Sequence, residues 1–313
     1  MRAFIRQFAI PLLGFAAIAL LASVLVFAVA MMRSAPSSPA SEKPLNPLDA
    51  YRELGTWIDL WDARAWNDPA GTVKDAADHG VRTLFIQTGN ARSTSGISNP
   101  AAMREFIKEA HAHKMYVIAW YLPTLKTGSV DYERFVQAIE FSTEDGQKFD
   151  SFALDIESTA VKPVSARNES LLELSARMRK RVGAKYPLGA ITPSPVGLRK
   201  QTGFWNVFPW REVAGVYDVL VPMAYYSYDS RSATQARTYA LSSMKIIRAQ
   251  PGCSTIPVHL IGGISNGSSA AEVRAFTKAA RETGCIGASN YDWAGMNSAR
   301  WKALTDGWDA GGK

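Results

Sequence analysis

The sequence predicts a (β/α)8 barrel of the TIM type, an α/β fold, preceded by one N-terminal transmembrane helix. Short apolar runs rich in β-branched and aromatic residues alternate with amphipathic helical patterns, which is typical of a parallel sheet. Eight such runs fall within residues 51–313, the number that closes a barrel. A doubly wound open sheet is the competing fold, but no glycine-rich phosphate loop follows the first run.

Residues 1–33 predict a membrane anchor. Residues 7–32 carry no charge and are numerous enough to cross a bilayer as a helix. The small side chains of Ala28 and Ala30 are typical of a signal-peptidase site, so cleavage near Ala30 and secretion is the alternative. The short basic N-terminus favours an N-inside orientation. We therefore expect the bulk of the chain to be extracytoplasmic and tethered to the membrane.

The remaining chain divides into a linker and one domain. Residues 34–50 are rich in Ser, Pro and Ala and predict an extended tether. Residues 51–313 then form the barrel. The whole chain is 47% hydrophobic and 20% charged, which is ordinary for a globular protein. Its net charge of +7 is spread along the sequence, and the basic cluster at 177–181 fits a solvated helix face, so we expect no nucleic-acid partner.

The predicted strands follow in chain order and are separated by helical patterns. Their ranges are 55–61, 81–89, 115–122, 149–157, 187–193, 217–226, 256–263 and 285–293. One of the helical patterns covers residues 268–284, with Ser at its start and Gly at its end. The stretch 194–216 shows no clear period and predicts a long loop with at most a short helix.

Two cysteines lie next to the last two predicted strands. Cys253 precedes the seventh strand and Cys285 begins the eighth, so both belong at the N-terminal face of the barrel. In an exported protein they could form a disulfide, whereas two buried free thiols are the alternative. Either way they lie far from the face that carries active sites, and we expect a structural role.

The fourth predicted strand ends in two carboxylates, Asp155 and Glu157. Side chains two residues apart on a strand share a face, so Ala153, Asp155 and Glu157 should point into the barrel, with Glu157 highest. Active sites of such barrels lie at the C-terminal ends of the strands. Two neighbouring carboxylates raise at least one pKa, which favours an acid and a charged partner for glycosidic cleavage. A pair neutralised by Arg or backbone amides is the structural alternative.

The same strand resembles the D-G-x-D-x-D-x-E motif of the family 18 glycoside hydrolases, the chitinase-like enzymes. Asp150 matches the first Asp, Asp155 the last Asp, and Glu157 the catalytic acid. Ser151 stands where the family has Gly, and Ala153 replaces the middle Asp. The resemblance implies a TIM barrel that cleaves glycans containing N-acetylhexosamine.

Two weaker matches extend this resemblance. Met223 and Tyr225 align with the family's M-x-Y-D, whereas Tyr226 stands in place of the Asp and Asp229 follows three residues later. Trp293 is similar to the tryptophan that floors the sugar site. The resemblance implies that the substrate's own N-acetyl oxygen attacks the anomeric carbon. Under it the acid protonates the leaving group, Asp155 stabilises the oxazolinium and Tyr225 holds the acetamido group.

A second resemblance is to the family 25 lysozyme-like muramidases. The opening of the barrel, residues 55–89, is similar to theirs, and those enzymes also carry a D-x-E on the fourth strand. This resemblance adds Asp292 and either Asp59 or Asp62 to the site. The two differ in parity, so on a regular strand at most one would face inward. Both families act next to N-acetylated hexosamines, so peptidoglycan and chitin-like oligomers remain alternative substrates.

Aromatic residues near the predicted strand ends supply faces for sugar stacking, with Trp61, Trp120, Tyr225 and Tyr226 the candidates alongside Trp293. Trp120 fits the barrel core equally well. His259 fits the core better than a ligand position, and no cluster has metal spacing, so we expect no metal and no cofactor. The sequence thus predicts an envelope glycoside hydrolase. A catalytically weak or inactive carbohydrate-binding barrel is the alternative, favoured by Ala153 and Tyr226.

Overall fold

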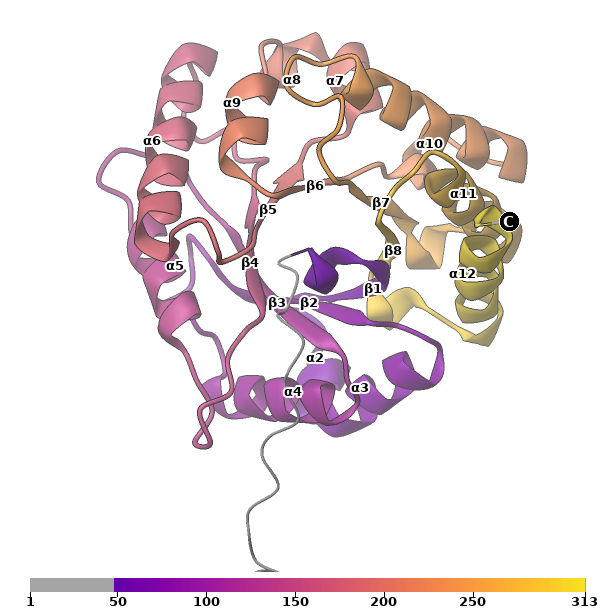
Figure 1. Cartoon of the computed structure of the whole chain (residues 1–313), viewed down its shortest axis with the longest axis horizontal. Helices are drawn as coiled ribbons and strands as arrows, with labels where there is room; N and C mark the ends of the chain where they lie inside the picture. The colour runs from indigo at the N-terminus through magenta and orange to yellow at the C-terminus, as the bar shows by residue number, and fades with distance from the viewer. Residues whose placement is uncertain (1–47, 313) are drawn as a thin grey trace, which may run out of the picture. The chain divides into compact units, whose positions relative to one another are not determined.

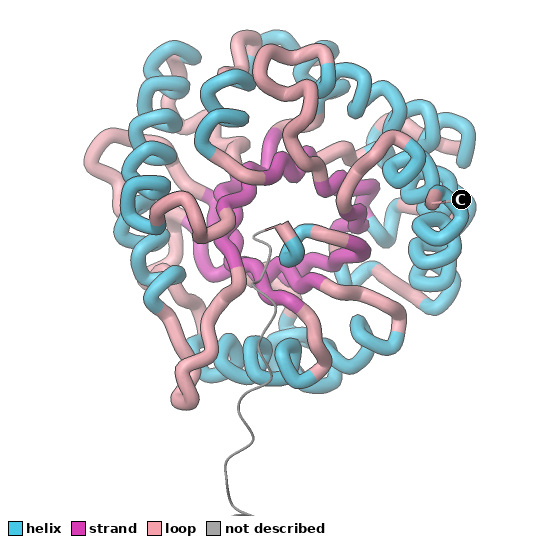
Figure 2. Tube along the Cα trace, viewed as in Figure 1, coloured by secondary structure: helices cyan, strands magenta, loops and turns pink. Residues whose placement is uncertain are grey.

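The structure, a computed structural model, describes residues 48–312, which form a (β/α)8 barrel. Eight parallel strands form the ring and the helices lie outside it (Figure 1, Figure 2). The strands are β1 (Glu53–Ile58), β2 (Thr83–Asn90), β3 (Tyr116–Leu122), β4 (Ser151–Asp155), β5 (Leu188–Thr192), β6 (Val219–Pro222), β7 (His259–Ile264) and β8 (Gly287–Tyr291). The ring closes between β6 and β7 through isolated bridges, Leu220 with Val258 and Met223 with Ile261.

The helices follow the strands in the expected alternation. They are α2 (Ala63–Asn67), α3 (Pro69–Asp78), α4 (Pro100–Ala112), α5 (Asp131–Glu140), α6 (Val164–Val182), α7 (Pro195–Lys200), α8 (Thr202–Trp205), α9 (Trp210–Val216), α10 (Ala233–Arg248), α11 (Ala270–Glu282) and α12 (Ser298–Gly311). Short 3-10 turns are η1 (Asp49–Tyr51), η2 (Tyr226–Tyr228), η3 (Ser265–Gly267) and η4 (Trp293–Gly295).

The predicted barrel is confirmed, and each predicted run overlaps one strand. The prediction for 194–216 was wrong, because this stretch contains the three short helices α7, α8 and α9. Ser194 caps the first of them by accepting a hydrogen bond from Gly197 N. Each helix is too short to display a clear hydrophobic period in the sequence.

The membrane anchor, the cleavage site and most of the linker fall on residues 1–47, which lie outside the described residues. Within residues 48–312, no helix is both long enough and apolar enough to cross a membrane.

One helix illustrates how local sequence sets the boundaries of an element. Ser269 begins α11 and accepts a hydrogen bond from Glu272 N, while the Glu272 carboxylate accepts one from Ser269 N. This reciprocal pair satisfies two donors that an uncapped helix leaves free. Gly284, with φ of 78°, follows the end of the helix. The Ser start and Gly stop predicted for this segment are therefore confirmed.

Large aromatic side chains fill the barrel interior. Trp57 of β1 stacks on Phe85 of β2 with ring centroids 4.1 Å apart, and Trp120 of β3 meets Trp57 edge-on at 5.8 Å. His259 is fully buried beside Phe85, as predicted, and burial lowers its pKa to about 4. The interior is thus a packed core, which leaves the rim at the strand ends as the place for a site.

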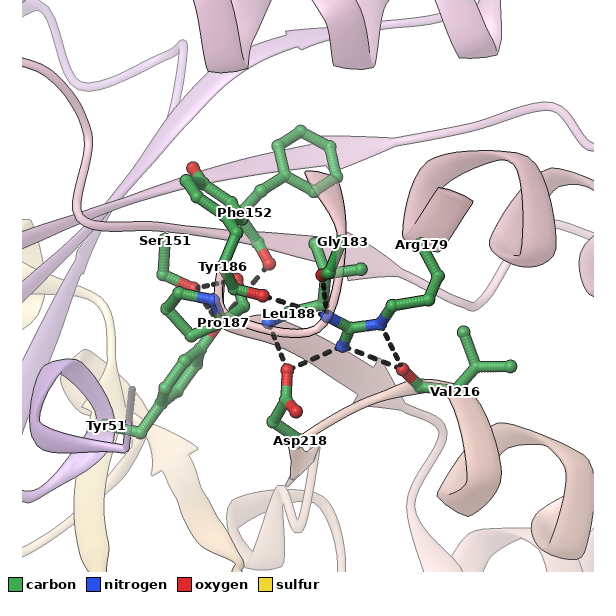
Figure 3. A network of polar contacts seen from close by, with 10 residues as sticks. All are labelled: Tyr51, Ser151, Phe152, Arg179, Gly183, Tyr186, Pro187, Leu188, Val216 and Asp218. Carbon is green, nitrogen blue, oxygen red and sulfur yellow. Dashed lines mark hydrogen bonds and ion pairs between the residues drawn. The ribbon is translucent and has the colours of Figure 1, made fainter. Parts of the chain in front are cut away.

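The bottom of the barrel is closed by η1. Its Tyr51 is fully buried, with the hydroxyl 2.6 Å from Ser151 Oγ, and Ser151 in turn donates to the Pro187 carbonyl (Figure 3). Beside it, the Arg179 guanidinium of α6 makes an ion pair of 2.6 Å with Asp218. It also donates to three backbone carbonyl oxygens, those of Gly183, Tyr186 and Val216. The groups named here are thereby satisfied within the fold, although the buried Tyr186 hydroxyl at the same end has no hydrogen-bond partner among residues 48–312.

The two cysteines are buried free thiols, so the disulfide alternative is not realised in the structure. Cys253 Sγ faces the Trp210 carbonyl at 3.7 Å, whereas Cys285 Sγ lies 3.4 Å from Met244 Sδ. Each sulfur therefore packs against a different neighbour. Cys253 precedes β7 as predicted, whereas Cys285, predicted to begin the eighth strand, lies two residues before β8.

The fit of Tyr51 gives the first prediction. A Cβ on Gly189 of β5 would lie 2.5 Å from the Tyr51 hydroxyl, so Gly189→Ala must displace the ring. We expect a loss of about 1–3 kcal/mol in the free energy of unfolding, measured by urea denaturation, because the core is overpacked. Gly203→Ala is the control, since nothing lies within 4 Å of its Cβ position. Equal stability of the two variants would contradict the proposed fit.

Candidate active site

The two predicted carboxylates lie at the C-terminal end of β4, where the barrel rim begins. Asp155 is the last residue of the strand and only 6% exposed, whereas Glu157 lies two residues beyond it and is half-buried. Ala153 packs within the barrel interior, so the alternation predicted for this strand is confirmed up to Asp155. Strand β4 itself stops at Asp155, two residues earlier than predicted.

Glu157 lines two cavities on the rim. The first, here named the β6 cavity, measures about 270 Å³ and extends over β5, β6 and α7. The second, here named the β2 cavity, measures about 380 Å³ and extends over the ends of β2 and β3. Glu157 is the one residue that lines both. The expected acid therefore stands at the junction of two open spaces.

The two cavities differ in their linings. The β6 cavity is largely apolar, with Leu198, Phe204, Met223, Tyr225 and Tyr228 among its walls, and its Lys200 and Asp229 form an ion pair of 2.7 Å. The β2 cavity is lined by amide, cationic and aromatic side chains, among them Gln87, Asn90, Arg92 and Trp61. A few polar groups in an otherwise apolar recess are typical of sites for small organic ligands.

Burial controls the ionisation of both carboxyl groups. Burial raises the pKa of Asp155 well above its usual range, and the neighbouring Glu157 charge raises it further. Burial also raises the pKa of Glu157. Asp155 Oδ1 is buried and has no hydrogen-bond partner in the described structure, so nothing in the fold offsets its desolvation. Burial therefore favours the protonated form of these carboxyl groups, as an acid for leaving-group protonation requires.

Two tyrosines border the carboxylates. Burial is the main cause of the raised pKa of Tyr225, and the charges of Asp155 and Glu157 raise it further. The Tyr225 side chain therefore lies near both carboxylates. Tyr291, the last residue of β8, lies 5.9 Å from Tyr225 between ring centroids and donates a 2.8 Å hydrogen bond to Asp59. Both hydroxyls therefore stay protonated and can act as hydrogen-bond donors.

Asp59 and Asp292 take positions at the edge of this group. Asp59 follows β1 and accepts hydrogen bonds from Tyr291 and from Trp61 N, so it fixes the β1–α2 turn as well as the tyrosine. Asp292 follows β8 and accepts from Gly295 N, and burial raises its pKa. Asp62 caps α2 by accepting from Ala65 N. Neither Asp59 nor Asp292 lines either cavity.

Three predicted sugar contacts are not brought to the cavities. Strand β8 ends at Tyr291, and Trp293 begins the turn η4, which points it away from the cavities. Trp293 is 7% exposed, donates a 2.8 Å hydrogen bond to Asp75 of α3, and has the Arg64 guanidinium over its ring. Tyr226 is fully buried and packs on Phe276 of α11. Trp120 packs in the barrel core, which was the alternative given for it in the sequence analysis. These three predictions are corrected accordingly, whereas Tyr225 and Asp229 do line the β6 cavity.

Tyr291 is the neighbour of the carboxylates that sequence reasoning missed. The alternation of side chains along β8 could have identified it. Ser289 accepts a hydrogen bond from Trp57 in the barrel interior, and Tyr291, two residues further on, lies on the same face of the strand. Trp293 has the same parity as Tyr291 but lies beyond the end of β8. Within residues 48–312, no cluster of three or more His, Cys, Asp or Glu residues is arranged to hold a metal ion.

Comparison with known proteins supports the fold. No family model matches the chain, and no curated protein does. Among solved structures, an endo-β-1,4-mannanase from Thermotoga petrophila matches with a TM-score of 0.60 at 13% identity, covering 83% of this chain and 77% of that one. The Bacillus cereus spore cortex-lytic enzyme matches with 0.59 at 10% identity, covering 82% and 74%.

A family 18 chitinase from Cycas revoluta, solved in complex with (GlcNAc)4, matches with a TM-score of 0.58 at 10% identity, covering 82% of this chain and 99% of that one. The chain thus has the barrel fold found in chitinases, a mannanase and a cortex-lytic enzyme. The chitinase-like barrel predicted from the fourth strand is confirmed as a fold.

The raised pKa of Asp155 predicts a pH-dependent stability. The folded protein keeps a proton that the unfolded chain releases above its ordinary pKa of 3.8, so stability falls as pH rises from there through the folded-state pKa. Asp155→Asn removes this ionisation. We therefore expect a higher Tm than wild type at pH 7.5 and a smaller difference at pH 4, measured by thermal melts.

Asp309→Asn on α12 provides the control, because it removes an exposed carboxyl outside the barrel core. A Tm difference between Asp155→Asn and wild type that does not change with pH would contradict a desolvated carboxyl at this position.

Proposed function

We propose that this protein is a glycoside hydrolase that cleaves glycans containing N-acetylhexosamine, with Glu157 as the acid and Asp155 as its partner. The observation that carries the proposal is the position of Glu157, which lines both rim cavities directly above the buried end of β4. The barrel fold shared with glycoside hydrolases is consistent with it.

In the proposed reaction Glu157 donates its proton to the leaving glycosidic oxygen. The raised pKa of this carboxyl keeps the proton available, and the half-buried position gives access to substrate. Following the resemblance to family 18, the substrate's acetamido oxygen supplies the nucleophile, a recognised exception to the scheme with two carboxylates. Asp155 and the Tyr225 hydroxyl orient the acetamido group, and water then opens the oxazolinium and returns a proton to Glu157.

The resemblance and the anchor-like residues 1–33 together suggest action at the cell envelope, outside the cytoplasm. We propose peptidoglycan as the first substrate to test, with chito-oligosaccharides as the second. A carbohydrate-binding barrel without turnover is the competing function, because Ala153 replaces an acidic residue of the resembled motif. The same experiment separates the two functions.

The full chain, kept in a mild detergent, and its Glu157→Gln variant would be incubated with each glycan, and new reducing ends identified by mass spectrometry. We expect products from the wild type and a loss of about 10²–10⁴-fold in rate for the variant, the usual contribution of a general acid. Glu169→Gln on the exposed face of α6 is the control and should keep the wild-type rate. Binding of the glycan by both forms without products would reject hydrolysis in favour of a binding protein.

Arg92 allows the two glycans to be distinguished. Its exposed side chain lines the β2 cavity, and its guanidinium has no hydrogen-bond or ion-pair partner among residues 48–312, whereas Lys200 in the β6 cavity is paired. An unpaired cation favours a glycan that carries carboxylates, as peptidoglycan does, over neutral chito-oligosaccharides.

We therefore expect Arg92→Gln to lower the affinity for peptidoglycan fragments about two- to fivefold, the scale of an exposed ion pair, and to leave chito-oligosaccharide affinity unchanged. Titration calorimetry would measure both affinities. Arg82→Gln, at the opposite end of β2, is the control. An equal loss for both glycans would contradict a role for the charge.

A further inference from the structure

The arrangement of the two cavities along the rim bears on how a glycan chain would lie. In the ring, β4 lies between β3 and β2 on one side and β5 and β6 on the other. The β2 cavity lies over the first pair and the β6 cavity over the second, with Glu157 between them. The acid therefore has open space on both sides, whereas a pocket for chain ends would be closed on one side.

Each cavity also contains a strongly exposed aromatic side chain. Trp61 in the β2 cavity is 70% exposed, and Tyr228 in the β6 cavity is 71% exposed. These are the two aromatic side chains with large exposed area among residues 48–312. An isolated exposed aromatic residue is common. One exposed aromatic residue in each of two cavities that share an acid is the arrangement expected of two binding positions. Aromatic faces offer sugar rings a stacking surface.

Local structure holds both aromatic residues in place. The backbone N–H of Trp61 donates a 2.7 Å hydrogen bond to Asp59, which Tyr291 also bonds, so the turn that carries Trp61 is tied to the site. Tyr228 belongs to η2, and its ring meets Tyr225 edge-on with centroids 6.1 Å apart. Both side chains are thus exposed on ordered backbone beside the tyrosines that border the carboxylates.

We infer that the two cavities form one substrate cleft open at both ends, in which Trp61 and Tyr228 each bind a sugar on opposite sides of Glu157. This inference rests on the proposed function and adds its mode of action. The protein cleaves internal bonds of a glycan chain. The cavities measure about 270 and 380 Å³, close to the lower end of the size of small-ligand sites, so together they accommodate more than one sugar unit.

The chemistry of the inferred step balances with water alone. One internal glycosidic C–O bond breaks as Glu157 protonates the leaving oxygen. The hydroxyl of water ends on the anomeric carbon, and its remaining proton returns to Glu157. The two fragments occupy the β2 and β6 cavities, from which each leaves through an open end.

The test uses binding without turnover, so that it does not depend on hydrolysis. The full chain carrying Glu157→Gln would be titrated in mild detergent with chito-oligosaccharides of increasing length. We expect affinity to increase with length until both cavities are filled. Adding Trp61→Ala or Tyr228→Ala should each lower the affinity for the longest oligomer about tenfold, the effect of losing about 1.4 kcal/mol of stacking. The affinity for the disaccharide should fall less.

The exposed Val207, which lines neither cavity, provides the control, and Val207→Ala should bind like its parent. Dimers that bind as tightly as the longest oligomer, with one of the two aromatic substitutions without effect, would overturn the open cleft and leave the proposed function standing. Absence of glycan binding by every variant, together with absence of products from the wild type on either glycan, would overturn both.

Discussion

The structure depends on a barrel interior that is filled by aromatic side chains. The stack of Trp57 on Phe85, with Trp120 edge-on, occupies the space that eight strands enclose. Because protein interiors pack as densely as organic crystals, this stack leaves no room for a ligand inside the ring. Asp155 lies at the top of it, desolvated by the same packing that stabilises the fold. The raised pKa of Asp155 is therefore a consequence of the core.

The two ends of the barrel differ in how their charged side chains are paired. At the bottom, Arg179 donates to Asp218 and to backbone carbonyls, and Tyr51 bonds Ser151 (Figure 3). At the top, Asp155 Oδ1 is buried without a partner. Native proteins leave few such groups unpaired, and those that remain call for an explanation. The bottom end pairs its charged Arg179 and Asp218 although the buried Tyr186 hydroxyl there has no partner in the described part of the chain, whereas the top end leaves a carboxyl oxygen of the candidate site unpaired. Active sites of such barrels lie at this top end.

The sequence was informative wherever one periodicity decided the outcome. Eight apolar runs alternating with helical patterns predicted the barrel. Period two along the fourth strand placed Asp155 on its inner face, because it fixes which side chains share a face. Prediction failed where strands give way to turns. Trp293 and Tyr226 begin the turns η4 and η2, where strand parity no longer applies, and each packs outside the ring. Because β8 ends at Tyr291, this residue and not Trp293 borders the carboxylates.

Ala153 stands where the resembled family 18 motif has an Asp, and this bears on what Asp155 must do in the proposed reaction. With an apolar neighbour below it in the core, Asp155 is coupled in charge to Glu157 above it. Burial favours the protonated form of both carboxyl groups, and a neutral Asp155 cannot stabilise a developing cation. Its ionisation must come from the substrate, through an amide N–H that pairs Oδ1 and through the positive charge that forms as the bond breaks. Lowering the pKa of Asp155 by one unit corresponds to about 1.4 kcal/mol of interaction, which stabilises the transition state relative to the free protein and substrate.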